Sequence, residues 1–181
     1  MNLKSLVGVK CILCYYYAYV QSRLTYGLIF WGSHASTIGR VFLSQKRVIR
    51  TIAGASYLEH CAPIFVRLKI MTVFSLYLFS MSMFVRQNMS RFTTNVSVSS
   101  GSINTRNSDR LVVPRHSTTL YERGPHFMGV KVYNALPDCF KVDTTSNKFK
   151  QTIKVFFTRH PFYSHNEYFN HRTENCRYCC G

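Results

Sequence analysis

Acidic residues are scarce in this sequence. It holds 7 Asp and Glu against 23 Lys and Arg, so the formal net charge is +16. Glu59 alone precedes residue 109, and the later acidic residues stand singly: Asp109, Glu122, Asp138, Asp143, Glu167 and Glu174. Nucleotide transfer by two Mg²⁺ ions needs clustered carboxylates, because these hard cations select anionic oxygen ligands. The sequence therefore argues against polymerase or nuclease activity, and we expect this chain not to be an enzyme by itself.

Other chemical signatures are missing as well. The sequence has no glycine-rich phosphate loop and no dinucleotide-binding fingerprint. His60 and Cys61 are neighbours in the sequence, but adjacency does not give the side-chain geometry that a catalytic Cys–His pair needs. We therefore expect Cys61 to be a core residue, no catalytic residue in the chain, and no cofactor.

Compartment and membrane signals are also sparse. The seven cysteines are an odd number without framework spacing, and no secretory signal layout opens the chain, which favours an intracellular site, cytoplasmic or nuclear, rather than secretion. Residues 70–85 carry no charge, but this stretch is shorter than the ~20 residues that span a bilayer. We expect a buried helix there. One alternative is a membrane-associated protein that inserts residues 70–85 beside anionic lipid.

The sequence combines an excess of positive charge with enough hydrophobic residues to fold. Hydrophobic residues make up 46% of it, enough for a core, and the sequence pI of about 9.9 is typical of proteins that bind polyanions. Most of the excess precedes residue 109. RNA or DNA, contacted through the phosphate backbone, is therefore the expected partner. A protein-interaction module with an incidental basic face is the second alternative.

Hydrophobic periodicity predicts a mainly helical fold. Residues 3–31 are expected to form a long Tyr-rich helix that ends near Gly27 to Gly32, with most of its aromatic side chains in the core. Residues 37–53 form the next helix, capped by Ser36 or Thr37 and ended by Gly54. Its apolar face comprises Ile38, Val41, Phe42, Val48, Ile49 and Ile52. A short helix from Pro63 and a longer one through Arg86 follow, separated by a break at residues 69–72.

The remainder divides by composition. Residues 88–109, rich in Ser, Thr and Asn, predict a linker between residues 1–87 and a small helical module at residues 110–160. That module begins with a short extended segment before Pro114. Two helices follow, with these apolar positions: Phe127, Val130, Tyr133 and Leu136 in the first, and, from Ser146, Phe149, Ile153, Phe156 and Phe157 in the second. The tail at residues 161–181 is expected to be flexible.

Two sets of basic residues are candidates for contacts with phosphate. The first lies opposite the apolar face of the helix at residues 37–53: Arg40, Lys46, Arg47 and Arg50. The second is looser: Arg106, Arg110, Arg115, Lys148, Lys150 and Lys154. Phosphate contacts position a protein on nucleic acid but carry no sequence information, so we expect binding without sequence preference.

The tail offers one weak metal candidate. His165, His171, Cys176 and Cys179 supply the nitrogen and sulfur ligands that tetrahedral Zn²⁺ prefers. Against this site, the interval between the ligand pairs is much shorter than the roughly twelve residues usual in zinc fingers. A frayed terminus is the alternative, and no other metal ligands are expected.

Several stretches stand out as an ordered set. They are SRLTYGLIFWG at residues 22–32, QKRVIRTIAG at 45–54, CAPIFVRLKI at 61–70, SLY at 75–77, NTRN at 104–107, LVVPR at 111–115, GVKVYNALP at 129–137 and NKFK at 147–150. In order and spacing they resemble the region downstream of the reverse transcriptase domain in jockey-type non-LTR retrotransposons. The resemblance extends from about residue 5 to about residue 169.

This resemblance implies both a role and a limit. The chain would be the thumb-like, C-terminal part of a transposable element's RNA-directed DNA polymerase, where helices grip the template–primer duplex and target RNA. The implied architecture is a helical thumb-like half followed by a small helical half with a short extended segment, and the implied protein partner is the upstream reverse transcriptase domain. The palm and endonuclease of the family have no counterpart here, and no position matches a catalytic residue of the family.

Overall fold

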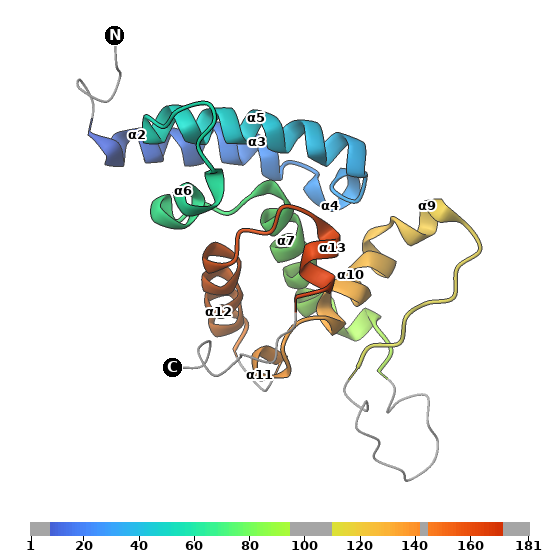
Figure 1. Cartoon of the computed structure of the whole chain (residues 1–181). Coiled ribbons are helices and arrows are strands. Elements are labelled where there is room, and N and C mark those ends of the chain that lie inside the picture. Colours follow the sequence, from blue (N-terminus) through green and yellow to red (C-terminus); the bar gives the residue numbers. More distant parts are fainter. Residues whose placement is uncertain (1–7, 95–109, 142–144, 172–181) are drawn as a thin grey trace.

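The N-terminal helices form an antiparallel layer (Figure 1). The computed structural model describes residues 8–94, 110–141 and 145–171. One side of the layer consists of three consecutive segments: α2 (Val9–Tyr15), the π-helical η1 (Tyr16–Gln21) and α3 (Ser22–Thr25). The other side is α5 (Ala35–Ala53), which lies beside them. Gly27, in the left-handed conformation with φ 59°, separates α3 from the short α4 (Leu28–Trp31). The predicted helix thus ends at Gly27, the first residue of the range in which its end was expected, and Leu28–Trp31 form a separate turn because the chain changes direction there.

Far fewer aromatic side chains between Tyr15 and Trp31 are buried than predicted. Tyr16 is 1% exposed, and Trp31 is partly buried. The other tyrosines are exposed: Tyr15, Tyr17, Tyr19 and Tyr26. The reason is that α2 and η1 lie at the edge of the layer, so that one face of them meets the core and the rest meets solvent.

α5 follows its predicted periodicity and carries one unexpected buried residue. Its apolar residues Ile38, Phe42, Ile49 and Ile52 are buried, and Gln45 is buried on the same stripe. Gly54 ends the helix in the left-handed conformation, as predicted. The predicted cap at Ser36 or Thr37 is wrong, because the amide of Ile38 already donates to the carbonyl of His34, which starts the first turn two residues earlier.

α6 (Cys61–Leu68) and α7 (Val73–Gln87) are the predicted short and longer helices. Lys69, with φ 55°, ends α6 at the predicted break, and α6 begins before Pro63, which fits the first turn because proline needs no amide donor there. Thr72 caps α7 by accepting from the amide of Ser75. Within the described residues no single helix is long and apolar enough to cross a membrane; α6 and α7 pass that test only together, bent by 50°.

The second half packs directly on α7. It comprises the 3₁₀ turn η2 (Met89–Arg91), α9 (Thr119–Glu122), α10 (Pro125–Asn134), α11 (Asp138–Lys141), α12 (Ser146–Arg159) and α13 (His165–Phe169). The extended backbone at Leu111 pairs with Thr94 in an isolated antiparallel bridge. α10 and α12 both lie against α7, so residues 8–87 and 110–160, predicted as separate regions, contribute to one hydrophobic core. The mainly helical fold is thus confirmed.

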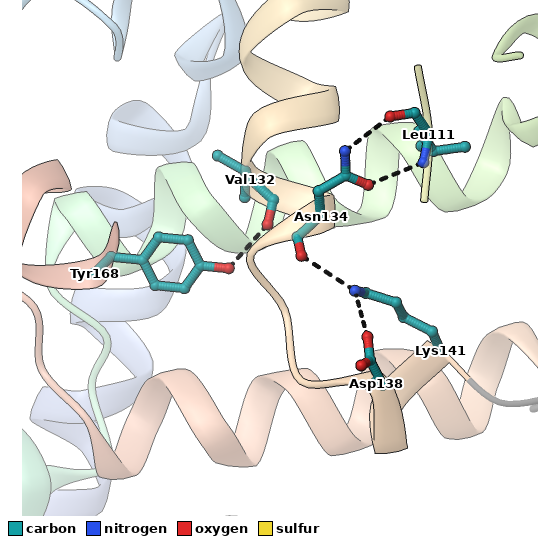
Figure 2. Close-up of polar contacts among 6 residues, drawn as sticks. All are labelled: Leu111, Val132, Asn134, Asp138, Lys141 and Tyr168. Atoms are coloured by element: carbon teal, nitrogen blue, oxygen red, sulfur yellow. Dashed lines mark hydrogen bonds and ion pairs between the residues drawn. The ribbon is translucent and has the colours of Figure 1, made fainter. Parts of the chain in front are cut away.

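The beginning of the C-terminal tail is packed, which corrects the prediction of flexibility from residue 161. Phe162 and Tyr168 are buried. The Thr72 hydroxyl donates to the carbonyl of Phe162 at 2.7 Å, and the Tyr168 hydroxyl donates to the carbonyl of Val132 at 2.9 Å (Figure 2). These aromatic anchors hold residues 161–171 on α7 and α10; residues 172–181 lie outside the described part.

Candidate nucleic-acid interface

Arg40 and Arg47 are the open cations of α5. They lie two turns apart on the exposed face of this helix, opposite the buried stripe. No carboxylate of the described chain lies within ion-pairing distance of either guanidinium. Glu59 is the sole acidic residue in residues 8–94, so this layer presents positive charge with almost no compensation. Such a surface attracts phosphate.

Lys46 and Arg50 do not share that open face, contrary to the prediction for this helix. The Lys46 ammonium lies 4.5 Å from the ring centroids of both Phe42 and Tyr163. Arg50 donates through Nε and Nη2 to the carbonyl of Glu59, at 3.2 and 3.0 Å. Their flank of α5 is covered by Tyr163, which is distant in the sequence, and by the backbone at Glu59, and helical periodicity alone reveals neither contact.

The second predicted set is dispersed. Lys148, Lys150 and Lys154 are exposed on α12, and Arg110 and Arg115 are exposed beside the extended segment. Arg106 lies outside the described residues. Figure 1 shows α12 below α6 and away from α5, so the structure does not join the two sets into one continuous surface.

Of the four zinc candidates, the structure describes only His165 and His171, and their rings have different partners. The His165 ring packs edge-on against Phe74, with centroids 5.2 Å apart, and burial lowers the pKa of this imidazole to about 4. His171 instead lies 5.1 Å from the ring of His160. Cys176 and Cys179 fall outside the described residues. Among residues 8–94, 110–141 and 145–171, no three metal-ligating side chains cluster.

Cys61 is a core residue, as predicted. Its side chain is buried and its sulfur lies 3.9 Å from the carbonyl oxygen of Glu59. The neighbouring His60 ring instead stacks on Tyr163 at 6.1 Å. The two side chains therefore have different partners and do not form a nucleophile–base pair.

The stretches that carry the family resemblance meet one another in the fold. Gly32, from the first stretch, lies against the ring of Tyr77, from SLY, so closely that a Cβ at position 32 would overlap this ring. In Figure 2 the Asn134 side chain pairs with the backbone of Leu111: its Nδ2 donates to the Leu111 carbonyl at 2.9 Å, and the Leu111 amide donates to its Oδ1 at 3.0 Å. These residues are packing and pairing contacts.

Gln45, from QKRVIRTIAG, is another such contact. Its Nε2 donates to the Tyr16 hydroxyl at 2.9 Å and to the Met71 carbonyl at 3.0 Å. Its Oε1 accepts from the amide of Val73 at 2.8 Å. One buried amide thus joins η1, α5 and the turn between α6 and α7.

Sequence reasoning missed an exposed column of side chains on the first helical segment. Tyr15 and Tyr19 stack with centroids 5.4 Å apart and 17° between their planes. The Arg23 guanidinium lies 3.9 Å from the centroid of Tyr19. The signal was present as a spacing of four residues, which places successive side chains on one side of a helix, but these tyrosines were assigned to the core.

Comparison of the chain with models of protein families, with curated proteins and with solved structures gives no match.

Proposed function

We propose that this chain is the thumb-like and downstream part of a jockey-type non-LTR retrotransposon reverse transcriptase, and that it binds RNA or DNA through phosphate without sequence preference. The resemblance of the ordered stretches supports the first part of the proposal. The chain supplies no clustered carboxylates for two-metal chemistry, so its contribution is to hold nucleic acid and not to extend or cut it. The upstream reverse transcriptase domain is the proposed protein partner.

The observation that carries the binding proposal is the uncompensated charge of α5 and its neighbours. Arg40 and Arg47 are exposed, and Glu59 is the sole acidic residue from Gly8 to Thr94. Arginine guanidinium groups contact phosphate oxygens through paired donors, and each neutralised phosphate releases condensed counterions. Binding of this kind weakens steeply as the salt concentration rises.

A salt titration tests the proposal. Binding of the full chain to a fluorescent oligouridylate, an oligodeoxythymidylate and a DNA duplex is followed by anisotropy. For six neutralised phosphates on single strands, log K should fall against log salt with a slope of about −4. Affinity that does not depend on salt, or no binding at low salt, would refute the proposal.

Variants that remove positive charge at two different places locate the surface. Replacing both Arg40→Gln and Arg47→Gln removes two phosphate contacts, so the slope for single strands should become shallower by about 1.4 and affinity near 0.15 M salt should drop roughly tenfold. Lys131→Gln is the control, because the Lys131 ammonium faces Glu122 at 4.0 Å. It removes one positive charge from a compensated site and should change affinity by less than about twofold. Equal losses in the two proteins would place the binding surface elsewhere.

A further inference from the structure

The column of Arg23, Tyr19 and Tyr15 ends in an open aromatic face. Tyr15 is 62% exposed and Tyr19 is 48% exposed. Tyr19 is covered by Arg23 on one side and by Tyr15 on the other. On its far side Tyr15 meets no other aromatic ring or cation in the described chain. A flat, exposed ring at the end of a preformed stack is a place where another planar group can continue the stack.

The helix α5, which carries Arg40 and Arg47, runs alongside the helical segment that carries this column. The Gln45–Tyr16 hydrogen bond joins α5 to η1, and further along, Val9 and Leu13 share a surface hollow with Ile52 near the end of α5. These contacts set an antiparallel register, visible in Figure 1 as two helical segments that run in opposite directions.

The register places cations and rings at the same levels. Counting outward from the Tyr16–Gln45 contact, Arg47 lies about level with Tyr15, and Arg40 lies about level with Arg23. Both arginines face solvent, as Tyr15 and Tyr19 do. A track of guanidinium groups beside a track of stacked rings is the arrangement that single-stranded nucleic acid fits, since its phosphates and its bases follow parallel paths. In a duplex the base faces are already stacked and are not available to a surface ring.

We propose that this surface binds single-stranded nucleic acid, with a base stacked on the open face of Tyr15 and phosphates on Arg40 and Arg47. The proposal rests on the proposed function and names its preferred ligand. Charge selects a polyanion, and the aromatic column selects an unpaired strand over a duplex. Because every base has a flat face, the stack adds affinity without adding sequence preference.

The first test compares Tyr15→Ala with Tyr15→Phe in the full chain, using oligodeoxythymidylate and a duplex of equal length as probes. Tyr15→Ala should weaken binding of the single strand about tenfold and binding of the duplex less than twofold. The salt slope should stay unchanged, because no phosphate contact is lost. Tyr15→Phe keeps the ring and should bind as the parent does. Tyr121→Ala, which removes an exposed tyrosine on α9, is the matched control and should have no effect.

Cysteine modification gives an independent readout. Cys11 is exposed and lies one turn before Tyr15 on the same side of the helix. Cys14 is also exposed, but as the direct neighbour of Tyr15 it faces a different side of the helix. Bound oligodeoxythymidylate should slow alkylation of Cys11, measured by peptide mass spectrometry, more than alkylation of Cys14 or of the exposed Cys139. Tyr15→Ala should abolish this protection at the same oligonucleotide concentration.

The outcomes separate the two proposals. If Arg40→Gln with Arg47→Gln weakens binding but Tyr15→Ala does not, the charged surface stands and the stacking site is wrong. Equal loss for single strand and duplex, loss with Tyr15→Phe as large as with Tyr15→Ala, or unprotected Cys11 would also overturn the stacking site. If the chain binds no nucleic acid at any salt concentration, both proposals fall.

Discussion

Replacing Gln45 by leucine should destabilise the fold more than any exposed change on α5. Leucine has a similar size but no polar atoms, so it leaves three buried groups without a partner: the Tyr16 hydroxyl, the Met71 carbonyl and the Val73 amide. Each unsatisfied group costs about 1–3 kcal/mol, and the better transfer of leucine into the core offsets part of this. The expected loss in the free energy of unfolding is about 3–5 kcal/mol.

A second substitution changes the sign of the effect at Tyr16. In the parent chain, Tyr16→Phe removes the hydroxyl that accepts from Gln45 Nε2 and should cost about 1–2 kcal/mol. In the Gln45→Leu background the same hydroxyl is an unpaired buried group, so Tyr16→Phe should recover about 1 kcal/mol. The difference isolates the Gln45–Tyr16 bond from general effects of changing the core.

Urea unfolding followed by far-ultraviolet circular dichroism measures all four proteins, provided that the slope against urea stays constant. Gln151→Leu, at an exposed position of α12, is the control and should lie within about 0.5 kcal/mol of the parent. Equal cost of Tyr16→Phe in both backgrounds would show that the buried amide does not bind this hydroxyl.

Two further predictions concern His165 and the glycines. The unfolded His165 has an ordinary pKa near 6.5 while burial holds the folded value near 4, so protons favour unfolding: stability is complete above pH 6.5 and falls by about 2 kcal/mol at pH 5. In urea titrations His165→Phe should remove most of that loss, and an unchanged pH profile would contradict the assignment. Gly32→Ala should lower the free energy of unfolding by about 2–3 kcal/mol, because its Cβ would lie 2.7 Å from the Leu28 carbonyl oxygen and overlap Tyr77. Gly39→Ala, at a position of α5 with open space around it, should instead raise the free energy of unfolding by about 0.5–1 kcal/mol. Similar melting temperatures for the two variants would refute this reasoning.

Much of the helical architecture could be predicted from the sequence, since spacing reports which side of a helix is buried. The inward residues of α12 and the left-handed stop at Gly54 follow from local rules. The exposure of Tyr15 and Tyr19 does not follow from local rules, because tyrosine occurs both in cores and on surfaces. Whether it is buried depends on which elements pack beside it. Gln45 offered a signal that was overlooked: it falls on the apolar stripe between Phe42 and Ile49.

The candidate interface was predictable only in part, for a related reason. Helical spacing places Arg40 and Arg47 away from the core, and the structure agrees. It does not show that Tyr163, more than a hundred residues later, returns to cover Lys46. Likewise, the tail, which is aromatic and His-rich and ends in cysteines, was expected to be flexible, whereas two of its aromatic side chains, Phe162 and Tyr168, are buried in the core.

The pairing of Asn134 with Leu111 determines which letters of these stretches can change. The contact to position 111 runs through its backbone, so the pairing places no demand on that side chain, which is buried and has only to fit the apolar core. Position 134 must offer a donor and an acceptor side by side at a fixed reach, which leucine, aspartate and the longer glutamine do not. Distant relatives of this chain should therefore keep the asparagine of GVKVYNALP, while the apolar residues of LVVPR vary. A search profile that gives more weight to this asparagine should be more sensitive to such relatives than one that weights both stretches equally.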